Sequence, residues 1–204
     1  MRWHENRRMS GPRVRLRPIK SSDFSAWRDV RERGRDWLEP WEPLPEPGAP
    51  DPVSDHEAFK VRCSTWERQW HFDNAYGFGL FLHDGTFVGE VSIGSVQRGP
   101  FQSGYLGYWI DEQHAGKGLV PEGVVLAMRF GFEELRMHRL EAAIVPRNKA
   151  SRAVAEKLEM REEGIAVRFL QIRGEWEDHV RYAMTSEEWL EKRQLLAEKF
   201  LSRG

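Results

Sequence analysis

The sequence predicts a mixed α/β domain whose central sheet is largely antiparallel and is flanked by helices. Short apolar runs with the period of strands are interspersed with longer segments whose apolar residues recur every three or four positions. Two pairs of strand-like runs are joined by short polar turns, at residues 83–85 and 173–175, which indicates hairpins rather than regular βαβ repeats. A chain of 204 residues is also long enough to bury one substantial core.

The N-terminal part is predicted to contain a flexible leader, one strand and two helices separated by a stiff loop. Residues 1–12 are basic and lack periodicity, whereas residues 14–17 alternate as a strand does. Residues 21–23, Ser-Ser-Asp, are typical of a helix start. Six prolines within residues 40–52 exclude a helix there and predict a long loop. A second helix is expected over residues 53–71.

The rest of the chain alternates between strand and helix patterns without repeats. The predicted elements are strands at 77–82, 87–93 and 105–110, a helix at 118–136, a strand at 139–145, a helix at 149–159, strands at 167–172 and 179–184, and an amphipathic helix at 186–201. No second domain boundary is visible, so residues 13–204 are predicted to form a single domain that ends in the C-terminal helix.

Composition narrows the classes of function. Lys and Arg number 31 against 32 for Asp and Glu, and this balance argues against a sequence-independent grip on nucleic acid or on an anionic membrane. The chain has no apolar run of membrane-spanning length, so we expect a soluble, cytoplasmic protein. Cys63 is the single cysteine, which excludes an intramolecular disulfide. The seven histidines show no ligand spacing, and we predict no metal.

The glycine-rich turn over residues 113–118, between a predicted strand and a predicted helix, is the most informative segment. Gly116 and Gly118 allow a sharp turn that brings several N–H groups to one point. The helix start adds unpaired donors, so the junction suits a phosphate or a pyrophosphate. It is not a P-loop, because Gly118 rather than Ser or Thr follows Lys117. The alternative is that the two glycines only cap a tight turn.

Several spaced motifs, in one order, resemble the GNAT family of N-acetyltransferases over residues 13–185. Gln113, Gly116 and Gly118 match that family's Gln/Arg-x-x-Gly-x-Gly/Ala signature. Further segments resemble the RimJ/RimL branch, which acetylates N-terminal amines of ribosomal proteins. These segments are residues 105–110, Glu122, residues 132–135, residues 138–140, Asn148 with Ser151, and residues 156–158. The Tyr-Leu-Gly-Tyr strand is similar to that of the RimJ-like, alanine-specific members.

The resemblance implies the GNAT acyltransferase fold and acetyl-CoA as cosubstrate. The turn would bind the pyrophosphate. The backbone beside Trp109 and Ile110 would separate from the following strand and pair with the pantetheine arm. One backbone N–H there would polarise the thioester carbonyl. Asn148 would contact pantetheine, and Ser151 would donate a proton to the leaving sulfur. Alternatively, Asn148 is only an N-cap and Ser151 a first-turn hydroxyl. The implied cofactor-binding residues are Trp109, Ile110, Gln113, His114, Ala115, Gly116, Lys117, Gly118, Leu119, Asn148 and Ser151.

Two residues are candidates for the general base. Glu90 interrupts an apolar strand, where an unpaired carboxylate is unfavourable unless it faces a wet site. The alternative is that Glu90 lies on the solvated face of the strand. Tyr105 is placed to hydrogen-bond into the site, or it is a core or rim tyrosine. With Ser151, these residues complete the predicted catalytic set.

The acceptor site is predicted at the proline-rich loop, which carries Trp37, Trp41 and Glu42 near its start. Aromatic and acidic rims suit a cationic amine; alternatively, the tryptophans anchor the core and the acids are solvated. We expect direct attack on the thioester by the α-amine of a protein N-terminus, an alanine of a ribosomal protein. The alternatives are acetylation of a small amine (amino acid, polyamine or aminoglycoside) and a non-catalytic acetyl-CoA-binding module. A monomer or homodimer without a nucleic-acid or membrane partner is expected.

Overall fold

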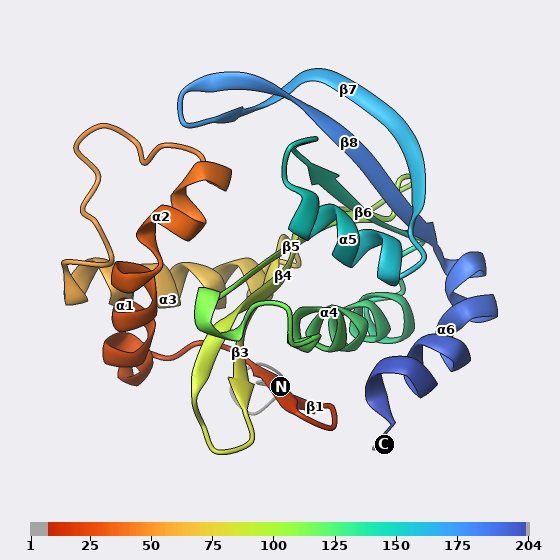
Figure 1. Ribbon diagram of the computed structural model, residues 1–204, viewed down its shortest axis with the longest axis horizontal. Helices are drawn as coiled ribbons and strands as arrows, with labels where there is room; N and C mark the ends of the chain where they lie inside the picture. Colours follow the sequence, from red (N-terminus) through yellow and green to blue (C-terminus); the bar gives the residue numbers. More distant parts are fainter. Residues whose placement is uncertain (1–7, 203–204) are drawn as a thin grey trace.

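The computed structural model describes residues 8–202, and its strands form one eight-stranded sheet (Figure 1). The order across the sheet is β1-β2-β3-β4-β5-β6-β8-β7, and the β5–β6 pair alone is parallel among the described strands. The strands are β1 (Met9–Ser10), β2 (Val14–Arg17), β3 (Tyr76–Leu82), β4 (Phe87–Gln97), β5 (Ser103–Ile110), β6 (Arg139–Ile144), β7 (Arg161–Ile172) and β8 (Glu175–Thr185). The predicted mixed α/β class with a largely antiparallel sheet is confirmed.

Helices flank this sheet and connect its strands. The α-helices are α1 (Phe24–Arg33), α2 (Arg35–Leu38), α3 (His56–His71), α4 (Leu119–Arg129), α5 (Lys149–Lys157) and α6 (Ser186–Leu201). Shorter turns are η1 (Ser21–Asp23), η2 (Glu39–Trp41), η3 (Glu112–His114) and the π-helical η4 (Phe130–Glu134). Over the described part of the chain, no helix combines the length and the apolar character needed to cross a membrane.

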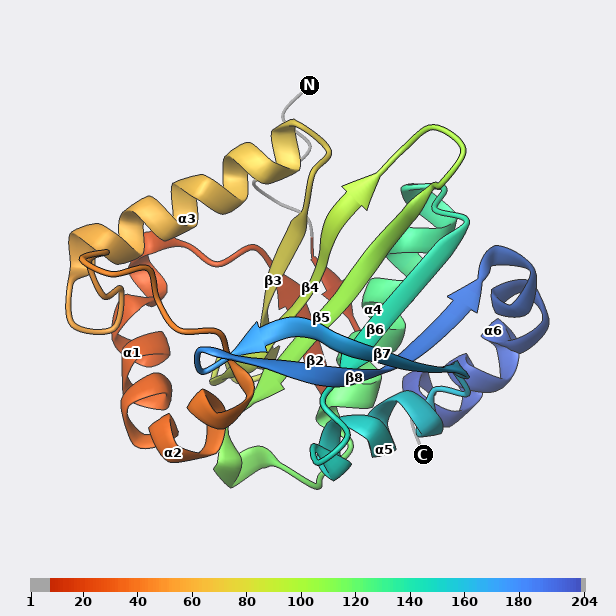
Figure 2. The ribbon, with the colours of Figure 1, turned by 90° about the horizontal axis from the view of Figure 1, so that it is seen from above.

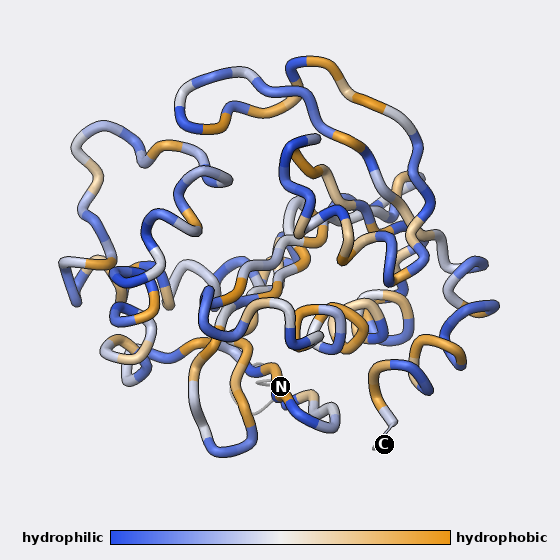
Figure 3. Tube along the Cα trace, in the orientation of Figure 1, coloured by the Kyte–Doolittle hydropathy of each residue, from blue (hydrophilic) through white to orange (hydrophobic). Residues whose placement is uncertain are grey.

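Different helices cover the two faces of the sheet (Figures 1 and 2). On one face, which we call the α1–α3 face, Trp27 of α1 reaches Glu90 of β4. On the opposite α4 face, Gly123 approaches β3 so closely that an added β-carbon would lie 2.8 Å from Cδ1 of Leu80. Figure 3 shows apolar residues gathered along the central strands and α4, which are buried together. The sheet therefore separates two environments, each with its own helices.

The structure corrects the predicted leader over residues 1–12. Met9 and Ser10 form β1, which pairs antiparallel with β2 through Met9 and Leu16. Burial of the Met9 side chain, which is 7% exposed, contributes to this pairing, although two residues are too few to produce a periodic pattern in the sequence. Residues 1–7 of the predicted leader lie outside the described residues.

The remaining differences are in the length of elements. The helix predicted over 118–136 is α4 up to Arg129 and then a π-helical turn. The proline-rich loop begins with the 3-10 turn η2, in which a proline is tolerated in the first turn because its missing N–H would have no partner there. The last hairpin is longer than predicted, since β7 already begins at Arg161.

Candidate active site

The parallel strands β5 and β6 are paired only at their beginnings. Residues 103–105 pair with residues 139–141, and from there β5 runs on to Ile110 and β6 to Ile144 without pairing to each other. Figure 2 shows the two strands diverging. Backbone groups on the facing edges of the separated strands have no ladder partner across the gap, so an extended ligand can bind between them. The structure thus has the strand separation that was predicted beside Trp109 and Ile110.

A cleft of about 730 Å³ lies at this separation. Of the predicted site residues, those that line it are Trp37, Trp41, Glu42, Trp109, Ile110, His114, Ala115, Gly116, Gly118, Leu119, Asn148 and Ser151. Gln113 and Lys117 belong to the same turn but do not line the cleft, and neither do Glu90 and Tyr105. The cleft therefore brings together the glycine turn, the end of β5, the start of α5 and the first part of the proline-rich loop.

The glycine turn has the backbone geometry of an anion site. Gly116 and Gly118 have φ angles of 74° and 75°, in the left-handed region that glycine adopts without strain. Among the described residues, no backbone group bonds to the N–H of Gly116, Lys117 or Gly118. The first N–H groups of α4, from Leu119 onward, add further unpaired donors and the positive end of the helix dipole.

Arg13 holds this turn from behind. Its guanidinium donates to the carbonyls of Lys117 at 2.7 Å and Gly118 at 3.0 Å. In a trans peptide the N–H points away from the carbonyl, so these bonds direct the N–H groups of Gly118 and Leu119 away from Arg13. Arg13 is in turn fixed by the fully buried Glu122, which accepts from its Nε and from its backbone N–H, both at 2.8 Å. The sequence analysis did not identify Arg13 as a residue of the site, because it lies 104 positions before Lys117.

Asp111 secures the other end of the turn. Its side chain is 1% exposed and accepts from Arg33 at 2.5 Å and from Nδ1 of His114 at 3.1 Å. Burial disfavours the charged form of Asp111, but the hydrogen bonds from Arg33 and His114 outweigh burial and lower its pKa. An ionised Asp111 therefore ties the glycine turn to the C-terminal end of α1.

Asn148 and Ser151 stand at the start of α5, on the cleft wall. Oδ1 of Asn148 accepts from the N–H of Ser151 at 3.0 Å, so the predicted N-cap interpretation is confirmed for Asn148. The hydroxyl of Tyr108 donates to the carbonyl of Ser151 at 2.9 Å, and burial raises the pKa of Tyr108, which keeps this donor protonated. Both bonds use the Ser151 backbone. Within the described residues, nothing bonds to the Ser151 hydroxyl, and Ser151 lines the cleft.

Residues 37–44, which comprise the end of α2, the turn η2 and the start of the proline-rich loop, are here named the strap. Nε1 of Trp37 donates to the carbonyl of Ile110 at 3.0 Å and so fixes the end of β5. The Glu42 carboxylate accepts two bonds of 2.6 Å from the guanidinium of Arg31. Glu42 lines the cleft, as predicted for the acidic rim, and its charge is paired with that of Arg31.

The strap also contacts the hairpin formed by β7 and β8. The N–H of Arg173, in the hairpin turn, donates to the carbonyl of Glu42 at 3.2 Å. The Arg147 guanidinium lies 4.8 Å from the ring centroid of Trp41 and pairs with Glu177 of β8. Figures 1 and 2 both show this hairpin extending toward the α2 region. The cleft is consequently bordered by segments far apart in the sequence.

Neither predicted base has a free acceptor atom. Glu90 is 7% exposed, and its two oxygens accept from Trp27 and Arg62, each at 2.6 Å, so the solvated-face alternative is wrong. The hydroxyl of Tyr105 accepts from Arg181 at 2.8 Å. This geometry does not favour either residue as the base.

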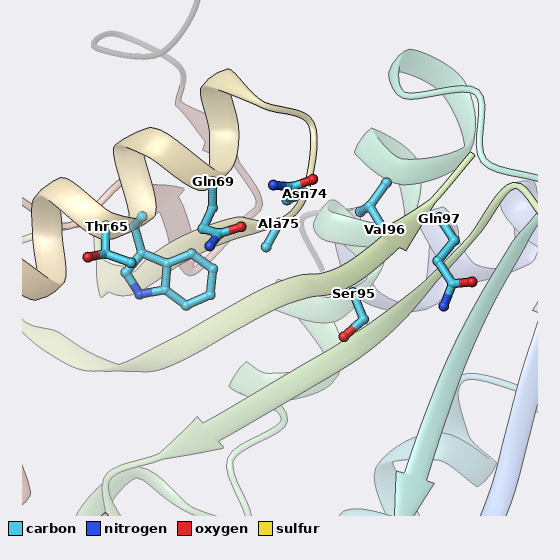
Figure 4. A pocket seen from close by; sticks show the side chains of 8 residues that line it. Thr65, Gln69, Asn74, Ala75, Ser95, Val96 and Gln97 are labelled. Atoms are coloured by element: carbon cyan, nitrogen blue, oxygen red, sulfur yellow. The ribbon is translucent and has the colours of Figure 1, made fainter. Parts of the chain in front are cut away.

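A second hollow, of about 520 Å³, lies between the C-terminal part of α3 and the end of β4 (Figure 4). It is lined by Thr65, Trp66, Gln69, Asn74, Ala75, Ser95, Val96 and Gln97. None of the predicted site residues lines it, so the cleft between β5 and β6 is the candidate active site. Across residues 8–202, no group of three or more His, Cys, Asp or Glu side chains is arranged to hold a metal ion.

Comparison with known proteins gives the same family in three ways. Residues 13–161 match the model of the Acetyltransferase (GNAT) domain. The ribosomal protein uS5-alanine N-acetyltransferase of Escherichia coli is 34% identical over 190 residues, which cover 89% of this chain and 96% of that protein. The structure of Mycobacterium smegmatis RimJ in complex with CoA-disulfide has a TM-score of 0.82 and 32% identity, over 92% of this chain and 90% of that one. The ribosomal-protein-S5-alanine acetyltransferase of Vibrio fischeri has a TM-score of 0.80 and 30% identity, over 90% and 99%.

Proposed function

This chain belongs to the GNAT family of N-acetyltransferases and is RimJ-like, and we propose that it acetylates the N-terminal α-amine of a ribosomal protein that begins with alanine. The observation that carries the proposal is one cleft that joins an anion-binding turn, a pair of separated strands and the free hydroxyl of Ser151. The similarity of this chain to the uS5-alanine enzymes supports the choice of acceptor.

The residues around the cleft fit acetyl-CoA. The N–H groups of residues 116–119 would hold the pyrophosphate, because a helix start with left-handed glycines concentrates donors and positive potential. The unpaired edge of β5 beside Trp109 and Ile110 would pair with the amides of the pantetheine arm. When bound, acetyl-CoA supplies the activated acyl group as a thioester.

The chain's own residues would then divide the chemistry between the two faces of the sheet. Tyr108 and Trp109 are neighbours on β5 and so point to opposite faces. On the Tyr108 side, the Ser151 hydroxyl would donate a proton to the departing sulfur. On the Trp109 side, the strap borders the space that the acceptor enters. A main-chain N–H near the end of β5 would polarise the carbonyl under attack.

The charges of the strap favour a peptide terminus over a small polycation. A polyamine or an aminoglycoside would need unpaired carboxylates, whereas Glu42 is paired with Arg31 and Glu39 lies near Arg35 and Arg173. A peptide terminus instead needs room for one amine and main-chain donors and acceptors along its length.

A panel of acceptors tests the proposal. Purified protein is incubated with acetyl-CoA, and free thiol is measured with peptides from the N-terminus of uS5 that begin with alanine, with the same peptides blocked at the amine, and with small amines. We expect turnover with the free alanine peptide and none with its blocked form. Turnover with small amines alone would contradict the proposal, and tight CoA binding without any turnover would indicate a binding module.

A further inference from the structure

The hollow between the C-terminal part of α3 and the end of β4, here named the α3–β4 hollow, takes no part in the reaction described so far. It opens on the α1–α3 face of the sheet, where Arg62 of α3 bonds to Glu90, the same carboxylate that Trp27 of α1 reaches. Figure 4 shows Gln69 on the side of α3 and Ser95 on the side of β4. The hollow and the strap therefore border the same face.

The side chains that line the hollow are mostly polar, and none of them carries a charge. Gln69, Asn74 and Gln97 supply carboxamides, and Ser95 supplies a hydroxyl. Within residues 8–202, no group hydrogen-bonds to these four side chains, and their polar atoms are not among the buried ones that lack a partner. A carboxamide both donates and accepts, as a peptide group does. The hollow thus presents accessible donors and acceptors to a neutral ligand.

Trp66 adds an aromatic wall to the hollow. Its ring lies against β3, because a β-carbon added at Gly77 would lie 2.6 Å from Cδ2 of the indole. The absence of a side chain at Gly77 is what leaves room for the ring. A ring held in this way contributes apolar contact area without losing further side-chain freedom when a ligand binds.

A bulge in β4 shapes the opposite wall. Pairing with β5 is irregular between Gly94 and Gln97, and Ser95 has a φ of 49°, in the left-handed region that is unfavourable for serine. The N–H of Val96 donates to the carbonyl of Asn74 at 2.9 Å, which ties the bulge to the loop after α3. Backbone strain of this kind is concentrated at ligand sites.

An open strip of the sheet connects the hollow with the candidate active site. Trp109, which lines the cleft, pairs with Glu90 and shares its face, and Ser92 and Gly94 share that face because alternate residues of a strand do so. Gly107 pairs with Ser92, and both are half-buried. A β-carbon added at Gly94 would meet nothing within 4 Å, so no described group covers the strand there. The strip runs from the cleft toward the hollow.

We propose that the α3–β4 hollow binds the acceptor polypeptide a few residues after its N-terminal alanine, an inference that rests on the proposed function. With the amine in the cleft, the chain would run along the strip formed by Gly107, Ser92 and Gly94. Three residues of extended chain cover about 10 Å, which is also the length of strand from Ser92 to Ser95, so residues from about the fourth onward reach the hollow. The carboxamides bind the main chain there.

The hollow also sets a preference for the residues that it binds. A charged side chain would lose water without gaining a partner among the uncharged lining residues, which is unfavourable. Neutral polar or small apolar side chains at these positions of the acceptor bind against Trp66 and the carboxamides without that loss. The acceptor is thus selected by its first residue at the cleft and by a neutral segment at the hollow.

Peptide length tests the proposal. Alanine peptides from the N-terminus of uS5, three and ten residues long, are compared by the release of free thiol from acetyl-CoA. We expect the KM of the ten-residue peptide to be about tenfold lower at a similar kcat, because contacts remote from the reacting atoms stabilise the bound substrate and the transition state alike. The double variant Gln69→Ala, Gln97→Ala should remove this advantage and leave the KM of the three-residue peptide and the Kd for CoA unchanged. Gln194→Ala, exposed on α6, is the matched control.

Gly94→Leu provides a second test, because its side chain would occupy the open strip. The φ of Gly94 is not positive, so the backbone there accepts a larger residue. The KM of the ten-residue peptide should again rise about tenfold, and that of the three-residue peptide less than about twofold. Equal KM values for the two lengths in the unchanged protein, or equal effects of the variants on both peptides, would overturn the proposal. Absence of turnover with either peptide would contradict the proposed function itself, and this proposal with it.

Discussion

The glycine turn and the strap border the same cleft but are held in different ways. The turn is secured by two carboxylates that are almost completely buried, Glu122 behind Arg13 and Asp111 beside Arg33. The strap is secured by Glu42, whose side chain is 32% exposed, on Arg31, and by contacts with the β7–β8 hairpin.

The two regions therefore differ in how unfavourable it is to release them. Removing Arg13 or Arg33 would leave a buried carboxylate without its partner, which is strongly unfavourable, whereas the partly exposed Glu42 carboxylate is still reached by water. Under the proposed function, this firmly held turn serves the cosubstrate. The part of the strap beyond η2 is an exposed loop, and loops at the border of a site commonly determine specificity.

Ser151→Ala removes the hydroxyl that lies between the two regions and should have the largest effect. We expect kcat to fall about ten- to a hundredfold, because the proton donor to sulfur is lost. The KM for acetyl-CoA should stay within about twofold, since the cap from Asn148 uses the Ser151 backbone N–H. Steady-state kinetics with both substrates measure this, and Ser202→Ala, beyond α6, is the control. An unchanged kcat would remove Ser151 from the mechanism.

Arg13→Ala tests the turn by itself. Loss of two charge-assisted bonds to the carbonyls of Lys117 and Gly118 should raise the Kd for CoA about tenfold, a change of about 1.4 kcal/mol. The KM for the acceptor should not change. Calorimetric titration with CoA measures the effect, and Arg15→Ala, an exposed residue of β2, is the matched control. Equal weakening of acceptor and CoA binding would contradict the separation of the two regions.

Glu42→Gln tests the strap and should have the smallest effect. The substitution keeps the shape of the side chain but removes the ion pair with Arg31, a contribution of at most about 1 kcal/mol for a partly exposed pair. We expect the KM for the acceptor to rise about threefold while the Kd for CoA is unchanged. Glu46→Gln in the exposed part of the same loop is the control. A rise in the Kd for CoA instead would show that the strap belongs to the cosubstrate site.

Local patterns predicted most of the elements, because periodicity, turn residues and prolines act over short distances. The glycine turn, the turns of both hairpins and the C-terminal helix are where the sequence placed them. β1 escaped prediction because its two residues are stabilised by pairing with β2 and by the burial of Met9, neither of which leaves a periodic signal.

How well a site residue was predicted depends on whether its interactions are local in the sequence. The residues of the glycine turn and of the α5 start are close together in sequence, and most of them line one cleft. The roles suggested for Glu90 and Glu42 depended on whether their carboxylates were free. Their partners, Arg62 and Arg31, come from other elements, so no local pattern revealed that both are paired.

The sequence by itself determined the family, the fold class and the glycine turn, because each is expressed in residues that are neighbours or lie in a set order along the chain. Only the tertiary structure decided what supports that turn and which groups remain chemically free. Arg13 reaches the turn from a position 104 residues away in the sequence, and Arg31 and Arg62 pair with Glu42 and Glu90 from other elements. Free lone pairs and paired charges are properties of the packed chain, since they depend on which groups folding brings within hydrogen-bond distance.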